Sequence, residues 1–287
     1  MLKKVYYCSA NKQNYFMSIL SKDRIKKLIL PHLSVGRRGL SISEKKRVGI
    51  LSAILYRLKT GCQWRELPTE RFFEEKYSYQ SVFYHFKRWC EDGSWEKLWV
   101  YLLKHYKKYL DMSSIQIDGS KTRANRGGQA VGFNHKHSKA STNLVYLCDN
   151  QGILIAISEP VSGNHHDMFH FSQHFKQLIV WLEKADISIE GLFLNADAGF
   201  DNDICRKTCE KYQIETNIDF NKRNTQNNQL CHHFDEVLYQ RRFVIERTFA
   251  WMDAFKALLI RYEYLAKHWF CFNILAMIVI FSRFIKC

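Results

Sequence analysis

The sequence predicts a mixed α/β domain preceded by a small basic helical domain. Three observations support this division. Apolar residues recur at helical spacing up to about residue 110, strand-like alternation begins at Ser114, and positive charge is concentrated before residue 113. We therefore expect a poorly defined segment over residues 1–19, a helical domain over 20–112 and the α/β domain over 113–287.

Charge is distributed unevenly along the 287 residues, whose net charge is +15. Residues 1–112 carry 23 Lys and Arg against 10 Asp and Glu, whereas residues 113–287 carry 20 against 18. A basic domain joined to a nearly neutral one is typical of a protein that binds a polyanion. Nucleic acid is the expected partner, and a membrane surface is the alternative.

The most apolar run of the chain is Trp269–Phe281. It is shorter than the ~20 residues that a membrane-spanning helix needs. We therefore expect a buried terminal helix and no membrane insertion. No secretory signal is expected at the amino terminus, and the nine cysteines are expected to be free thiols in a reducing cytoplasm.

Helical spacing of apolar residues predicts four helices in the basic domain. They cover residues 20–33, 43–59, 78–90 and 94–110, with Ser21 and Ser43 as candidate caps. A helix-turn-helix grouping would place helix 78–90 in a DNA groove. The aromatic residues of this helix favour a bundle core, whereas the exposed basic residues favour DNA contact. Those basic candidates are Arg37 and Arg38 in a turn and Lys87 and Arg88 on the helix.

The second domain shows a different order of elements. We expect strands over 114–118, 143–148 and 152–159, a helix over 167–184, a strand over 191–195, a helix over 201–212, a strand over 214–218, and helices over 239–260 and 266–285. Three strands in series suit an antiparallel meander, and the later βαβ steps suit parallel additions to the same sheet. The order β-β-β-α-β-α-β-α-α is that of a ribonuclease H-like fold. Residues 119–141 lack a core-forming pattern and are expected to form a basic loop or loose hairpin.

Three acidic residues occupy positions where sheet enzymes place reactive groups. Asp118 ends an apolar strand, Asp197 directly follows the apolar segment GLFLN, and Glu246 lies on a helix beside several arginines. Each alone also fits a turn, a cap or a surface salt bridge. Together, three carboxylates suit Mg²⁺ or Mn²⁺, which prefer oxygen ligands. A zinc site from Cys205, Cys209 and residues 231–233 is the weaker alternative, because its spacing is loose.

Several motifs make the chain resemble bacterial DDE transposases of the insertion-sequence class, in the family of insertion sequence five within the broader family of insertion sequence four. The matching segments run over most of the chain: RRGLS (37–41), ILYRLKTGCQWRELP (54–68), VFYHFKRWCEDGSWEKLW (82–99), IDGS (117–120), SGNHHD (162–167), ADAGFD (196–201) and RRFVIERTFAWMDAF (241–255).

The resemblance implies catalytic and metal-binding roles for Asp118, Asp197 and Glu246, with Mg²⁺ or Mn²⁺ as cofactor. It also places a Y-x2-R-x3-E signature on Tyr239, Arg242 and Glu246. The broader signature continues with Lys after six intervening residues, where this chain has Asp253. The matching residues 165–167 have two interpretations: a cap on the following helix, which we favour, or a local contribution to the site.

The resemblance implies a DNA transposase that binds terminal inverted repeats, cleaves DNA strands with Mg²⁺ and joins them to target DNA. The protein would assemble as a homo-oligomer on paired DNA ends, in the bacterial cytoplasm at the nucleoid. The expected DNA contacts beyond the helical domain are Lys121, Arg123, Arg126, Lys136, Lys139, Tyr239 and Arg242. Two alternatives stay open: an inactive or domesticated relative that only binds DNA, and a nuclease without a joining step.

Overall fold

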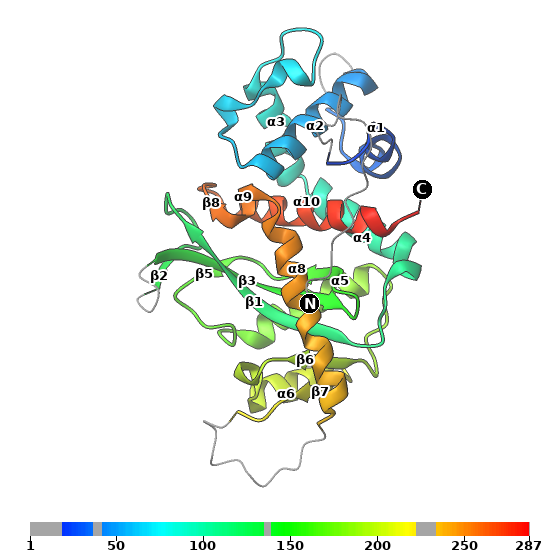
Figure 1. Ribbon diagram of the computed structural model, residues 1–287, viewed down its shortest axis with the longest axis vertical. Coiled ribbons are helices and arrows are strands. Elements are labelled where there is room, and N and C mark those ends of the chain that lie inside the picture. Colours follow the sequence, from blue (N-terminus) through cyan, green and yellow to red (C-terminus); the bar gives the residue numbers. More distant parts are fainter. Residues whose placement is uncertain (1–18, 37–41, 135–138, 222–233, 287) are drawn as a thin grey trace, which may run out of the picture.

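The computed structural model describes residues 19–36, 42–134, 139–221 and 234–286 (Figure 1). Arg37, Arg38 and Lys136 lie outside the described residues, as do residues 231–233 of the alternative zinc site. The division of the chain at residue 112 stays a prediction, because the hydrophobic core is one continuous cluster that includes residues from both sides of it.

Helices make up the described part of the chain before residue 110. They are α1 Lys22–Arg24, continued by a π-helical turn Ile25–Ile29 and a 3₁₀ turn Leu30–His32, then α2 Glu44–Thr60, α3 Tyr79–Glu91 and α4 Ser94–Tyr106. Ser21 and Ser43 cap α1 and α2 through their side chains, as predicted. Phe86 and Trp89 of α3 are buried, so the aromatic face of this helix builds a core.

Eight strands within the described residues form one mixed sheet. They are β1 Ile115–Ala124, β2 Gly132–Asn134, β3 Lys139–Asp149, β4 Leu154–Ile157, β5 Val161–Ser162, β6 Phe193–Ala196, β7 Glu215–Ile218 and β8 Ile260–Arg261. The central strands run in the order β4-β3-β1-β6-β7. Neighbours among β4, β3 and β1 are antiparallel, whereas β6 and β7 are parallel additions beside β1. This meander with parallel additions is the strand order of a ribonuclease H-like fold, as predicted.

Of the two structures expected for residues 119–141, a loop or a loose hairpin, the structure shows the hairpin, and it is longer and more regular than expected. β1 continues to Ala124 and pairs with β3 from Ile115↔Asp149 to Arg123↔Ser141. The long hairpin is held by Arg261, whose buried guanidinium donates to Thr142 Oγ1 at 2.5 Å and to the Gln129 carbonyl at 2.7 Å. A contact across more than a hundred residues therefore orders a segment that has no local pattern.

The expected long helix over residues 239–260 is broken into several elements. These are α7 Glu236–Tyr239, a 3₁₀ turn Gln240–Phe243, α8 Val244–Asp253 and α9 Lys256–Leu259. Phe255 has an extended backbone, with φ −97° and ψ 99°, and its side chain is buried. The helix is interrupted at this extended residue, which separates α8 from α9 and whose ring packs in the core.

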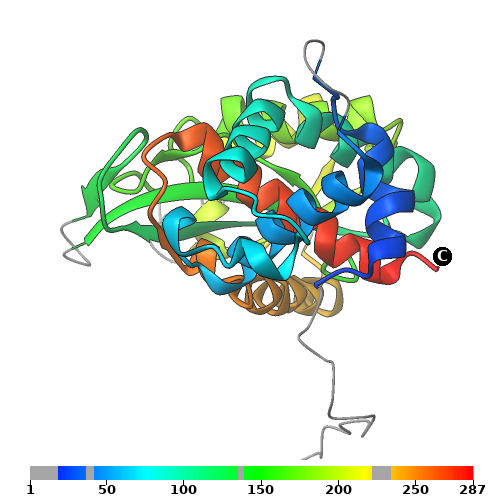
Figure 2. The same ribbon diagram turned by 90° about the horizontal axis from the view of Figure 1, so that it is seen from above.

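The carboxyl-terminal helix α10, Ala266–Phe284, lies between the helical region and the sheet (Figures 1 and 2). It packs against α3 and α4 on one side and against α8 and β4 on the other. The helix is long and apolar enough to span a membrane, but 83% of its apolar window is buried inside the protein. The prediction of a buried terminal helix is therefore confirmed.

A buried ion pair also joins the helical region to the carboxyl-terminal part. Arg57 of α2 lies 2.5 Å from Glu263, and both side chains are 6% exposed. The Arg57 guanidinium also lies over the rings of Trp64 and Phe272, at 4.7 and 4.8 Å. This cluster fixes α2 against the segment that leads into α10.

Candidate active site

Asp118 lies on β1, and Asp197 directly follows the neighbouring parallel strand β6, where its Oδ1 accepts a hydrogen bond from the Gly199 amide at 2.9 Å. The register pairs Gln116 of β1 with Asn195 of β6, and each aspartate follows two residues later. Because side chains alternate along a strand, both aspartates extend from the same face of the sheet as this amide pair. The prediction that these two acids meet is supported by their charge interaction, since the Asp197 carboxylate raises the pKa of Asp118.

The pKa of Asp118 is raised from 3.8 to about 6. Burial of the carboxyl group is the main cause, and the neighbouring carboxylates of Asp197 and Asp167 add to it. The Gly119 amide, which donates to Asp118 Oδ1 at 2.7 Å, and the Arg242 guanidinium oppose this shift. Negative charge around Asp118 therefore outweighs the positive charge of Arg242, as expected of a site that binds a cation.

Tyr239 and Arg242 lie beside these acids, at the turn between α7 and α8. Arg242 lowers the pKa of Asp118, and the charges of Asp197 and Asp219 act on the Tyr239 hydroxyl. The Arg242 guanidinium lies over the rings of Tyr239 and Phe243, at 5.6 and 4.8 Å. The turn Gln240–Phe243 contacts both β1 and β6. It therefore holds the cationic side chain against the carboxylate-bearing part of the sheet.

Glu246 lies on the edge of α8 that borders this region. Arg242, Glu246 and Phe249 form one stripe at helical spacing. The ring of Phe249 lies 5.6 Å from that of Tyr146, the cross-strand partner of Asp118. Glu246 itself is exposed to solvent. Among the described residues, no group of three His, Cys, Asp or Glu side chains is arranged to hold a metal ion. The structure therefore brings Asp118 and Asp197 close to each other, but it does not bring Glu246 into a common metal site with them.

The predicted cap role of residues 165–167 is wrong. Helix α5, Phe171–Lys184, begins after His170, and no side chain caps it. Asp167 instead accepts a hydrogen bond from Asn143 Nδ2 at 2.7 Å and packs against β1 at Gly119, where an added Cβ would lie 2.1 Å from Asp167 Oδ1. Gly119 faces the opposite side of the sheet from Asp118. Asp167 therefore braces the back of the strand directly behind the site, which only glycine permits.

The predicted DNA contacts are spread over two parts of the described structure. Lys121, Arg123 and Lys139 are exposed on the β1–β3 hairpin, and Arg126 is exposed at its turn. On α3, Lys87 forms an exposed pair with Glu91 at 3.6 Å. The Arg88 guanidinium donates to the Ser34 carbonyl at 2.9 Å, so it has a structural contact of its own. Whether these residues contact DNA stays a prediction.

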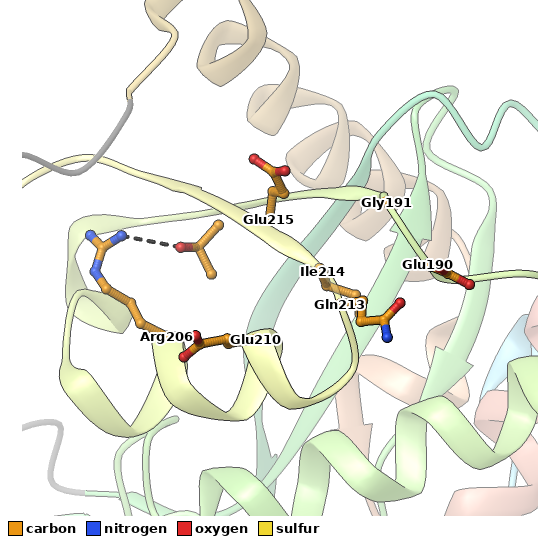
Figure 3. Close-up of a pocket in the computed structure, with 8 residues that line it drawn as sticks. Glu190, Gly191, Arg206, Glu210, Gln213, Ile214 and Glu215 are labelled. Atoms are coloured by element: carbon orange, nitrogen blue, oxygen red, sulfur yellow. Dashed lines mark hydrogen bonds between the residues drawn. The ribbon is translucent and has the colours of Figure 1, made fainter.

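One hollow of the described structure lies at the outer strand β7, and neither Asp118 nor Asp197 lines it. It has a volume of about 650 Å³ and is lined by residues such as Glu190, Glu210 and Glu215, with Arg206 at one side (Figure 3). The Arg206 guanidinium donates to Thr216 Oγ1 at 3.1 Å and is paired with Asp201 at 2.6 Å. A lining rich in carboxylates does not suit a phosphate backbone, so this hollow is not the candidate site.

Two features of the site were missed in the sequence. The bracing contact of Asp167 depends on Gly119 and Asn143, which no spacing connects. Buried amides at Gln116, Asn195 and Asn217 stand two residues before Asp118, Asp197 and Asp219, and this repeated amide-x-Asp pattern is visible in the sequence. The pattern is a signal that strand periodicity could have detected.

The fold and the paired acids define a ribonuclease H-like protein with carboxylates at the centre of its sheet. The chain belongs to the family of DDE transposases: a family model described as "Transposase DDE domain" matches residues 109–281. A second model, described as "Putative transposase of IS4/5 family", matches residues 23–99. The resemblance to insertion-sequence transposases is thereby confirmed, and the protein is a DDE transposase of the IS4/5 type, an enzyme that acts on DNA.

A search of the curated proteins found no match. Among solved structures, a pre-cleavage Mos1 transpososome is 13% identical, with 79% of this chain and 81% of that chain covered and a TM-score of 0.27. The catalytic domain of Mos1 mariner transposase is 10% identical, with 61% and 91% covered and a TM-score of 0.29. A Mos1 mariner paired end complex with Mn is 14% identical, with 83% and 78% covered and a TM-score of 0.29. Likeness at this level is too distant to support statements about this chain.

Proposed function

We propose that this transposase binds the terminal inverted repeats of an insertion sequence, cleaves the DNA strands at its ends and transfers them to target DNA. The observation that carries the proposal is the pair of Asp118 on β1 and Asp197 at the end of the neighbouring parallel strand β6, with Arg242 beside them. This arrangement suits phosphodiester chemistry in a transposase DDE domain. The carboxylates can bind a metal cation, and the guanidinium of Arg242 can bind the anionic phosphate that reacts.

The donor chemistry of the site fits a divalent cation. Asp118 and Asp197 both supply carboxylate oxygens, and their mutual repulsion contributes to the raised pKa of Asp118. We assign Asp118, Asp197 and Glu246 as the residues that would hold Mg²⁺ or Mn²⁺. When bound, the metal would supply Lewis acid chemistry at the phosphate and a more acidic attacking water or hydroxyl.

The chain's own residues would bind and orient the DNA. Arg242 lies beside the two acids, where its guanidinium can hold a phosphate oxygen by paired hydrogen bonds. Lys121, Arg123 and Lys139 extend along the exposed hairpin and would neutralise backbone phosphates. We propose that Lys87 and Arg88 of the helical region contact the repeats. Arg37 and Arg38, for which the same role was expected, lie outside the described residues. Cleavage at both ends implies a homo-oligomer on DNA, acting in the bacterial cytoplasm at the nucleoid.

The test is cleavage of DNA that carries the ends of the element, with Mg²⁺ and with EDTA. The variants Asp118→Asn, Asp197→Asn and Glu246→Gln should each lose about 10²-fold or more in cleavage rate, since each removes a carboxylate that would hold the metal and, with the metal, the charge stabilisation of the reacting phosphate. Glu210→Gln on α6, Asp203–Lys211, serves as the control, because Glu210 is exposed and lies on another element. Cleavage by the three site variants at the rate of this control would refute the assignment.

A second function, DNA binding without cleavage, is favoured by one observation. Glu246 is exposed, and no described cluster of three acids is ready to hold a metal. A protein of this kind would bind repeat-containing DNA equally well with and without Mg²⁺ and release no cleaved strand. A nuclease without a joining step would release cleaved strands but give no strand-transfer product with a target plasmid.

A further inference from the structure

A ladder of three buried amide side chains crosses the sheet beneath the candidate site. Asn217 Nδ2 donates to Asn195 Oδ1 at 2.9 Å, and Asn195 Nδ2 donates to Gln116 Oε1 at 3.2 Å. The ladder thus runs from β7 through β6 to β1. The three side chains are 2% exposed or less, so their polar groups need partners within the protein. At the inner end of the ladder, Gln116 Nε2 donates to the Asp149 carbonyl at 3.3 Å.

The outer end of the ladder holds the backbone of Asp235. Asn217 Oδ1 accepts from the Asp235 amide at 2.8 Å, and Asn217 Nδ2 donates to the Asp235 carbonyl at 2.9 Å. One asparagine side chain therefore satisfies both polar groups of one residue. Asp235 is also the cap of α7, because its Oδ1 accepts from the Leu238 amide at 2.9 Å. The chain that carries Tyr239 and Arg242 starts from this doubly held residue.

Apolar packing does little to hold the same chain in place. Neither α7 nor the turn Gln240–Phe243 contains a buried residue. A hollow of about 310 Å³, lined by Asn217, Asp235 and Leu238 among others, lies beside α7. Buried side chains on this chain resume only at Ile245. The hydrogen bonds from Asn217 to Asp235 therefore anchor the start of a segment that has no fully buried residue before Ile245.

We propose that Gln116, Asn195 and Asn217 are positioning residues that fix the segment carrying Tyr239, Arg242 and Glu246 over Asp118 and Asp197. Strand periodicity supports the link, since each amide of the ladder precedes an aspartate by two residues and lies on the same face. The ladder acts through the backbone of Asp235 and contacts no DNA. The catalytic part of this inference rests on the proposed cleavage function, whereas the anchoring part does not.

The first test is hydrogen exchange of the amides over residues 236–246 in Asn217→Leu, which keeps the branching of the side chain but removes its hydrogen-bonding groups. Exchange of these amides should rise about tenfold or more, because the segment can open without breaking apolar contacts. Thr208→Val is the control: it removes the 2.7 Å hydrogen bond between Ser172 and Thr208 but touches no ladder residue. If Asn217→Leu does not fold, Asn217→Ser leaves space for a bridging water and takes its place. If the exchange rate over residues 236–246 rises no more in the Asn217 variant than in Thr208→Val, the proposal is overturned.

The second test is single-turnover cleavage with saturating DNA and Mg²⁺. Asn217→Leu should lower the cleavage rate about 10²-fold, the effect of a displacement of about 1 Å at a reacting site. The Kd for repeat DNA should stay within about twofold, because the substituted side chain is buried. Cleavage at the rate of Thr208→Val would overturn the catalytic part. If the parent protein itself does not cleave, the proposed function fails, and hydrogen exchange alone decides the anchor.

Discussion

The substitution Asp118→Asn should stabilise the metal-free protein at neutral pH while abolishing its proposed chemistry. The pKa of Asp118 is raised from 3.8 to about 6 in the folded state. The folded state therefore binds a proton more tightly than the unfolded state. The stability that this proton contributes is fully present below pH 3.8, falls as pH rises, and is lost above pH 6. The asparagine side chain in the variant would not titrate and would keep the hydrogen bond from Gly119.

The magnitude follows from the size of the shift. A change from 3.8 to about 6 corresponds to roughly 3 kcal/mol of unfolding free energy, at 1.36 kcal/mol per pKa unit. The stability of Asp118→Asn relative to the parent should therefore rise by up to about 3 kcal/mol between pH 4 and pH 7.5. The shifted pKa of Asp149, also about 6, is present in both proteins and cancels in the difference.

Urea unfolding in EDTA at pH 4, 5, 6 and 7.5 measures this difference directly. Asp197→Asn serves as a second variant, because removal of its charge should lower the pKa of Asp118 and flatten the pH dependence. Parallel stability curves for Asp118→Asn and the parent, separated by a constant amount, would show that Asp118 has an ordinary pKa and would refute the reasoning.

Three further predictions concern the ion pair, the hairpin and α8. Glu263→Gln should lower the free energy of unfolding by about 3 kcal/mol, because it leaves Arg57 charged and buried, and urea unfolding measures the loss. The double variant Lys121→Ala and Arg123→Ala should reduce the slope of log K against log salt for DNA binding by about 0.9 for each phosphate that the hairpin no longer neutralises, as measured by anisotropy. Asp253→Lys should steepen the same slope by about 0.9, because Asp253 is exposed and the family signature has lysine there.

Matched variants control these predictions. Asp186→Asn removes an ion pair with Lys104 whose partners are 49% and 59% exposed, and it should lower the stability much less than Glu263→Gln does, because solvent screens an exposed pair. If Asp186→Asn loses more unfolding free energy than Glu263→Gln, burial does not decide how much an ion pair contributes to stability. Lys176→Ala, on the exposed face of α5, should leave the salt slope unchanged. If the salt slope is unchanged in the hairpin variant, the hairpin does not neutralise DNA phosphates. If the salt slope becomes shallower in Asp253→Lys, residue 253 on α8 does not lie near phosphates.

Local signals in the sequence were sufficient for the elements and for the first two acids. Helical spacing predicted α2, α3, α4 and α10, and serine caps marked where helices begin. Asp118 and Asp197 could be selected because each follows an apolar run, although the prediction that Asp118 ends its strand is wrong, since β1 continues to Ala124. Glu246 was selected by its motif. Periodicity and capping are properties of a few consecutive residues, so they can be read without knowing the fold.

By itself, the sequence determined the class of fold and the order of most of its helices and strands, because each element follows from a residue pattern of fewer than twenty positions. It also predicted which acids form the site. Only the tertiary structure decided the extent of the β1–β3 hairpin, the break after α8, the place of Asp167 behind Gly119 and the amide ladder under the site. The physical reason is the same in each case: the partners are brought together by folding. Arg261 orders the hairpin at Thr142, and Asn217 holds Asp235, through hydrogen bonds that no local pattern encodes.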